Sequence, residues 1–135
     1  MTPDYAIALI ETRPIDSQAL RRLFDDAGWW PEREIRDIRS VLDSGPAVGA
    51  WLEDELVGFA RAVSDGIFRA YVEDVVVATA HRGRGIGARM MDALLEDLEG
   101  IHTISLFCED SLVPLYSRSG FRPTKQRVLH RQQIP

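Results

Sequence analysis

With 135 residues, of which 45% are hydrophobic and 27% charged, the chain has the composition of one globular domain spanning residues 1–135. The net charge of −5 argues against non-specific nucleic-acid binding, and the single cysteine, Cys108, excludes an internal disulfide. Three scattered histidines show no zinc spacing, no secretory signal is visible, and no apolar run approaches a membrane span. We therefore expect a cytoplasmic protein without a metal, nucleic-acid or membrane partner.

The elements follow from apolar periodicity and from the glycines and prolines between periodic segments. In chain order we expect a strand (5–11), a helix capped by Asp16 or Ser17 (to 27), a helix starting near Pro31 (to 42), strands at 47–53, 56–64 and 70–77, a long helix (86–99), a strand (103–107), a short helix (111–119) and one bent or broken strand pair (121–131). The charge run in the second helix indicates a solvated face.

This order predicts a mixed α/β sheet, of the α+β type, with helices packed on its faces. The strand at 70–77, the long helix and the strand at 103–107 form a unit that implies parallel pairing through a right-handed crossover. The remaining strands are expected to pair antiparallel, so the sheet is mostly antiparallel.

The most informative motif is Arg82-Gly83-Arg84-Gly85-Ile86-Gly87, which follows the apolar run Val75-Val76-Val77 and opens the long helix. Glycine lets backbone N–H groups approach a ligand, and the first turn of a helix favours an anion. The motif lacks the Gly-Lys-Ser/Thr ending of a Walker A loop and the glycine spacing of the dinucleotide fingerprint. It predicts a site for a phosphate-bearing ligand; the alternative is a helix start that uses glycine for packing alone.

The motif matches the Arg/Gln-x-x-Gly-x-Gly/Ala signature of the GNAT superfamily of N-acetyltransferases, and the element order is similar to that fold across nearly the whole chain. The segment Leu115-Tyr116-Ser117-Arg118-Ser119-Gly120-Phe121 resembles a second family pattern. The segment Val72 to Val77, with Cys108 and Tyr116, resembles the glucosamine-6-phosphate N-acetyltransferase branch. Leu112 stands where that branch has an asparagine, so its sugar-phosphate substrate is not carried over.

The resemblance implies acetyl-coenzyme A as the donor. Backbone groups of Val75, Val76 and Val77 would pair with the pantetheine arm like an added strand. The amides of Gly83, Arg84, Gly85, Ile86, Gly87 and Ala88 would hold the pyrophosphate. Arg82 and Arg84 could support the phosphates, although a solvated Arg84 side chain is an equal alternative. A homodimer is common in this fold.

Acetyl transfer to an amine needs a neutral amine, a donor for the oxyanion and a proton for the departing thiolate. Tyr116 matches the family's proton donor; its alternative is a half-buried core tyrosine. Glu73 and Asp74 are the base candidates, expected on opposite strand faces, with Glu73 preferred on the face of Val75 and Val77 unless a bulge reassigns the faces. Their alternative is an ion pair with Arg69 or Arg61.

The resemblance also makes the Val77 amide the oxyanion donor. A covalent route through Cys108 is disfavoured, because no histidine is expected beside it. Trp29 and Trp30 lie where this fold shapes the acceptor pocket, and Phe68 could join them; either tryptophan could instead anchor the second helix.

These features predict direct transfer from acetyl-CoA to the primary amine of a small molecule. The alternatives are a protein or peptide N-acetyltransferase and a non-catalytic acyl-CoA sensor.

Overall fold

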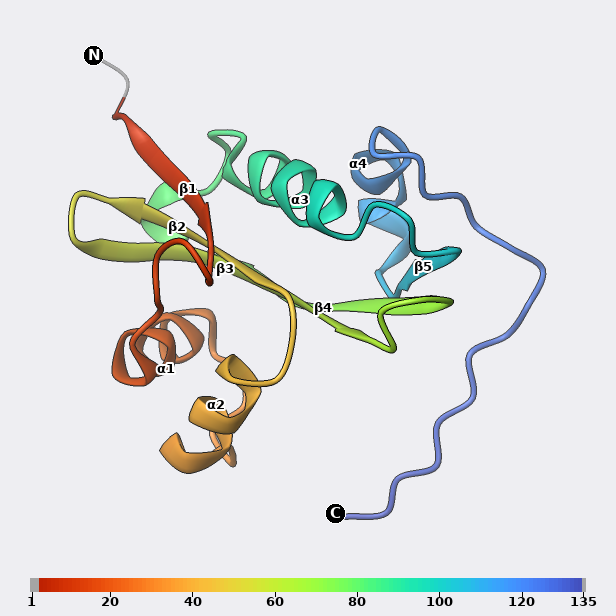
Figure 1. Cartoon of the computed structure of the whole chain (residues 1–135), viewed down its shortest axis with the longest axis horizontal. Helices are drawn as coiled ribbons and strands as arrows, with labels where there is room; N and C mark the ends of the chain where they lie inside the picture. Colours follow the sequence, from red (N-terminus) through yellow and green to blue (C-terminus); the bar gives the residue numbers. More distant parts are fainter. Residues whose placement is uncertain (1–2, 135) are drawn as a thin grey trace.

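The computed structural model describes residues 3–134, so residues 1, 2 and 135 of the expected 1–135 domain lie outside the described part. In chain order the elements are β1 (Tyr5–Leu9), α1 (Ser17–Ala27), α2 (Ile35–Leu42), β2 (Ala47–Leu52), β3 (Glu55–Ser64), β4 (Arg69–Val77), the 3-10 turn η1 (Thr79–His81), α3 (Ile86–Asp97), β5 (Thr103–Leu106), the 3-10 turn η2 (Asp110–Leu112) and α4 (Val113–Ser117) (Figure 1).

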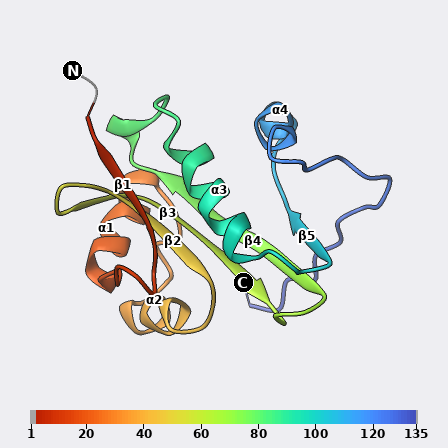
Figure 2. The ribbon, with the colours of Figure 1, turned by 45° about the horizontal axis from the view of Figure 1, so that its top comes forward.

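The five strands form one sheet in the order β1-β2-β3-β4-β5. The first four pair antiparallel with their neighbours, and β5 pairs parallel with β4 after the crossover through α3. Helix α3 covers one face, whereas α1 and α2 cover the other (Figures 1 and 2). The expected mixed, mostly antiparallel α/β sheet with flanking helices is confirmed.

Each face of the sheet carries its own apolar cluster. On the α3 side, Met90, Met91 and Leu94 pack against alternate residues of the strands. On the other side, Phe24 of α1 and Ile38 of α2 pack against the sheet. Two separate cores hold the sheet rigid from both sides, so the ends of its strands can position a site.

Helix α3 approaches the sheet most closely at Gly58 of β3. A Cβ placed there would lie 2.9 Å from the sulfur of Met90 and 3.1 Å from the Cβ of Ala50. Glycine at this position therefore sets the distance between the helix and the sheet, because any larger residue would push Met90 outwards.

The two N-terminal helices begin and end through local caps. The Asp16 carboxylate accepts a hydrogen bond from the Ala19 amide at 3.0 Å, and Gly28 closes α1 with φ of 74°. Helix α2 begins at Ile35 rather than near Pro31, because Trp30 adopts φ of 54° and a turn follows it. The predicted first cap and first glycine stop are confirmed, while the start of the second helix was placed too early.

The strand pair expected over 121–131 is wrong. Within the described part of the chain, residues 122–134 form no helix or strand and are exposed; they run from α4 to the C-terminus as an extended tail (Figure 1). Pro123 has no amide hydrogen, and four basic residues separate the few apolar ones, so the segment offers little to pair or bury. No helix among residues 3–134 is long and apolar enough to cross a membrane.

Candidate functional site

Strand β4 extends beyond the end of its partner β5, so the two strands separate at that point. Parallel pairing ends at Val72 and Leu106, but β4 continues to Val77. Along these last residues Val75 and Val77 pack toward α3, and Val76 packs toward α1 and α2. The backbone of 73–77 therefore faces a gap on its β5 side, which can accept an extended ligand by the hydrogen bonding of a strand.

The glycine motif forms an open turn directly beyond this gap. Gly83 and Gly85 adopt φ of 75° and 78°, a region that disfavours other residues. Nothing lies within 4 Å of a Cβ built at Gly83, Gly85 or Gly87. Ile86 begins α3, whose first-turn amides have no partner within the helix. The turn thus combines free space with unpaired donors, as an anion site requires.

A buried tyrosine holds this turn against β1. The Tyr5 hydroxyl lies 2.7 Å from Nδ1 of His81 and accepts a hydrogen bond from Nη1 of Arg84 at 2.9 Å. Nε of Arg82 donates to the Val77 carbonyl at 3.0 Å. Both loop arginines are therefore bonded to the protein itself, while Arg84 stays exposed.

Asp74 sits in a β-bulge, which changes the faces of the strand. β3 pairs Phe59 with Val76 and Arg61 with Glu73, so β4 has one extra residue between these pairs. Asp74 has φ of 57°, a strained conformation for a non-glycine residue.

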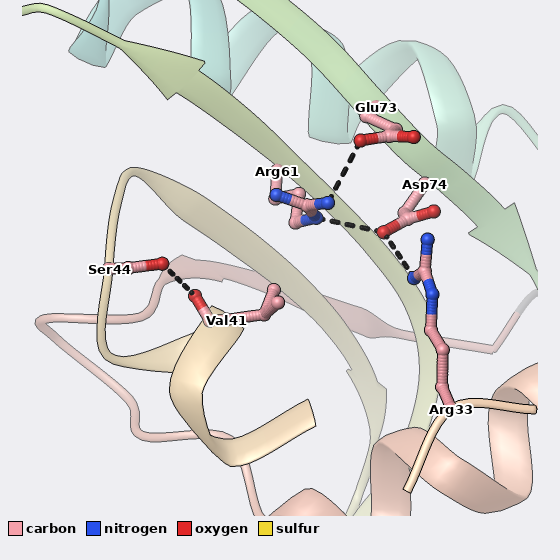
Figure 3. Close-up of polar contacts among 6 residues, drawn as sticks. All are labelled: Arg33, Val41, Ser44, Arg61, Glu73 and Asp74. Atoms are coloured by element: carbon pink, nitrogen blue, oxygen red, sulfur yellow. Dashed lines mark hydrogen bonds and ion pairs between the residues drawn. The ribbon is translucent and has the colours of Figure 1, made fainter. Parts of the chain in front are cut away.

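The two acids do not separate to opposite faces as expected, because the bulge brings both onto one guanidinium (Figure 3). Arg61 donates through Nη2 to Glu73 at 2.9 Å and through Nε to Asp74 at 2.8 Å. The ion-pair alternative with Arg61 is therefore present. The Asp74 side chain is completely buried, whereas that of Glu73 is 28% exposed. Only Glu73 is open to a water molecule or an acceptor.

Arg33 closes this cluster from the segment between α1 and α2. Its Nη1 donates to the same Asp74 oxygen at 2.9 Å, and its guanidinium lies 4.5 Å from the ring centre of Trp30. Trp30 Nε1 and the other Asp74 oxygen are buried without a partner among the described residues. Buried unpartnered polar atoms are costly, so their occurrence beside two strained residues marks this cluster as a functional candidate.

A pocket of about 470 Å³ opens beside the cluster. It combines an apolar wall from the two N-terminal helices with groups of both charges. The lining residues are Leu20, Phe24, Glu32, Arg33, Asp37, Ile38, Val41, Arg61 and Ile134. Such a pocket suits a small molecule with an apolar body and a polar end.

Tyr116 lies on α4 beyond β5, packed with its ring edge-on to Phe121 at 6.2 Å. Burial and the nearby Cys108 both raise the pKa of its hydroxyl, because each disfavours the phenolate. Tyr116 therefore keeps its proton at neutral pH and can donate it. Cys108 itself is exposed.

The predicted acceptor residues do not all meet. Trp29 packs on Phe24, which lines the α1–α2 pocket, with centroids 6.5 Å apart, and on Trp30 at 6.0 Å; neither tryptophan lines the pocket itself. Phe68 lies at the other end of β4, where it packs on His102, and it does not line that pocket. The structure thus brings the tryptophans to the acid cluster but leaves Phe68 apart.

Sequence reasoning missed two features: the role of Arg33 in the acid cluster, and the hydrogen bonds that join Tyr5 to His81 and Arg84. Arg33 stood in a charge run interpreted as solvated, yet its side chain is only 23% exposed. No local pattern distinguishes it from its neighbours. Tyr5 is 4% exposed and was placed only as the start of a strand. A tyrosine opening an edge strand gives no signal of a partner at position 84.

Known proteins with similar sequences and structures agree on one family. The acetyltransferase (GNAT) family matches residues 10–121. Rice serotonin N-acetyltransferase 2, a chloroplastic protein, is 37% identical over 116 residues, covering 79% of this chain and 56% of its own length. Soybean histone acetyltransferase TAP1 is 29% identical over 128 residues, covering 84% and 53%. The chain thus spans about half the length of these two relatives.

The same family is found among solved structures. A Xanthomonas campestris structure assigned to the GNAT family superimposes with a TM-score of 0.80 at 29% identity, covering 98% of this chain and 95% of its own. Residues 10–121, which the family matches, include the β4–β5 split, the glycine turn and Tyr116. The chain therefore belongs to the GNAT family of acetyltransferases.

Proposed function

We propose that this chain is an acetyl-CoA-dependent N-acetyltransferase that transfers the acetyl group directly to the primary amine of a small molecule. The observation that carries the proposal is the split between β4 and β5, which leads straight into the open glycine turn. In this proposal the pantetheine arm pairs with Val75, Val76 and Val77, and the amides from Gly83 to Ala88 hold the pyrophosphate.

The residues around the split divide the chemistry between them. The amine nitrogen attacks the thioester carbon, the carbon–sulfur bond breaks, and Tyr116 gives its proton to the sulfur. Glu73 takes the amine's proton through a water molecule, supported by its exposure. Asp74, buried against two guanidinium groups, acts as the anchor of Arg33 and Arg61 rather than as a base. The Val77 amide is the proposed oxyanion donor.

The pocket beside α1 and α2 is the proposed acceptor site. Its apolar lining, with Trp29 and Trp30 next to it, supports an amine on an aliphatic or aromatic body. The name of the rice relative, a serotonin N-acetyltransferase, supports the same class. The name of the soybean relative, a histone acetyltransferase, supports the alternative of a protein acceptor.

A thiol-release screen with acetyl-CoA tests the proposal against small amines, amino sugars, polyamines and peptides. We expect turnover with at least one hydrophobic amine, a loss of about 10²–10⁴-fold in Tyr116→Phe, and a change in the acidic limb of the pH profile in Glu73→Gln. A non-catalytic sensor would bind CoA in calorimetry but release no thiol with any amine. Absence of both binding and release would overturn the proposal.

We also propose that the enzyme acts in the cytoplasm as a homodimer and needs neither metal nor nucleic acid. The chloroplastic name of the rice relative favours a plastid instead. Fractionation of cells that express the natural protein tests the compartment, and light scattering of the purified chain tests its oligomeric state.

A further inference from the structure

The chain contains a single lysine. Of its 16 lysine and arginine residues, Lys125 alone is a lysine. It lies in the exposed tail that follows α4, between Phe121 and His130, where the described chain forms neither helix nor strand. An arginine guanidinium stays protonated and is not an amine nucleophile, whereas a lysine amine becomes nucleophilic when it loses its proton. The chain thus offers one side-chain amine to its own proposed chemistry.

The tail is attached to the proposed proton donor. The Phe121 ring meets that of Tyr116 at 6.2 Å, and the Phe121 amide donates to the Tyr116 carbonyl at 3.3 Å. Four residues lead from Phe121 to Lys125, a span of at most about 14 Å, and the lysine side chain adds roughly 6 Å. The Lys125 amine can therefore reach the surroundings of Tyr116 while α4 stays folded.

The far end of this segment is held as well. His130 packs edge-on to Phe107, just after β5, with centroids 5.8 Å apart. Phe121 and His130 thus attach the segment at both ends on the β5 side of the split, and Lys125 lies about midway. A short flexible tether gives an effective concentration on the order of millimolar, comparable with a free amine substrate.

We propose that Lys125 is an acetyl acceptor of its own chain, an inference that rests on the proposed function. The neutral Lys125 nitrogen bonds to the thioester carbon, the carbon–sulfur bond breaks, and Tyr116 protonates the departing sulfur. The proton lost by the nitrogen leaves through Glu73 or water. The products are one acetyl-lysine and one free CoA thiol, so no further reactant is needed.

The modification would change the charge of the tail. Residues 118–134 contain Arg118, Arg122, Lys125, Arg127 and Arg131 and no acid, within a chain of net charge −5. Acetylation removes the only one of these charges that this chemistry can neutralise.

Intact-mass spectrometry of the purified chain with acetyl-CoA, but no added amine, tests the inference. We expect the gain of one acetyl group, mapped to Lys125 by peptide analysis, with a rate per chain that is unchanged by roughly tenfold dilution of the protein. Lys125→Arg should gain none, and Tyr116→Phe should slow the gain by about 10²-fold or more.

A matched pair of variants separates enzymatic from uncatalysed acetylation. Arg127→Lys adds a lysine between Phe121 and His130, and Arg39→Lys adds one at an exposed position of α2. We expect acetylation of the first and not of the second. Equal acetylation of the two added lysines would overturn the inference, as would an unmodified Lys125 or a rate that rises with protein concentration. If the protein still acetylates free amines when one of these outcomes is found, the proposed function stands and only the self-acetylation of Lys125 is overturned.

Discussion

Replacing Tyr5 by phenylalanine removes one hydroxyl and with it both bonds that hold the glycine turn to β1. The bond with His81 is worth about 0.5–1.5 kcal/mol, and the charge-assisted bond from Arg84 about 1.5–3 kcal/mol. Arg84 is exposed and His81 is half-buried, so both can bond to water afterwards and the lower end applies. We expect the free energy of unfolding to fall by about 2 kcal/mol and Tm by roughly 5–10 °C.

The same variant should weaken coenzyme binding, because the ligand must then order the turn itself. If about 1 kcal/mol of that ordering falls on binding, the Kd for CoA rises roughly fivefold. Calorimetry with CoA and with pantetheine, which lacks the pyrophosphate, separates the effects, since pantetheine should bind unchanged. Tyr71→Phe is the matched control, because its hydroxyl makes no hydrogen bond within residues 3–134. An unchanged Kd for CoA, or an equal loss for pantetheine, would refute the reasoning.

Three further changes test other parts of the structure. Asp74→Ala leaves Arg33 and Arg61 without their shared carboxylate, so urea unfolding should show a loss of about 3–5 kcal/mol, whereas Arg36→Ala, in an exposed pair, should cost less than about 1 kcal/mol. Gly58→Ala crowds Met90 and should cost about 1–3 kcal/mol, while Gly87→Ala meets no atom and should not destabilise the fold; equal values would contradict the contact. The raised pKa of Tyr116 means that the folded state holds its proton longer than the unfolded state, so its contribution to stability is complete below pH 10 and is lost as pH rises through the folded pKa. Tyr116→Phe should therefore lose less stability above pH 10 in alkaline unfolding, and an identical loss would argue against a buried hydroxyl.

The parts of the fold that were predicted correctly depend on neighbours in sequence. Asp16 caps a helix three residues away, and Gly28 ends it, so both signals are local. The positions of the five strands along the chain followed from apolar segments that glycines and other turn residues separate. The strand pair predicted over 121–131 was wrong because a strand needs a partner strand. Apolar residues such as Val128 and Leu129 do not reveal whether a partner strand is available.

The site divides in the same way. The glycine motif and Tyr116 could be named as candidates from the sequence because their spacing is fixed within a few residues, and their roles stay predictions. The arrangement of Glu73 and Asp74 was not, because one inserted residue in β4 rotates every side chain after it. Nor could charge patterning show that Arg33 meets an acid that lies 41 residues away.

If acetyl-CoA binds in the split between β4 and β5 as proposed, the stability of the folded chain depends on the supply of that metabolite. A molecule that binds only the native state raises its stability by RT ln(1 + [L]/Kd), about 2.7 kcal/mol at a hundredfold excess over Kd. Parallel pairing ends at Val72, so main-chain donors and acceptors of 73–77 on the β5 side can pair with foreign strands when no ligand covers them. On the proposed function, copies without bound acetyl-CoA would be degraded or would aggregate first, so the cell's supply of acetyl-CoA would govern the lifetime of the protein.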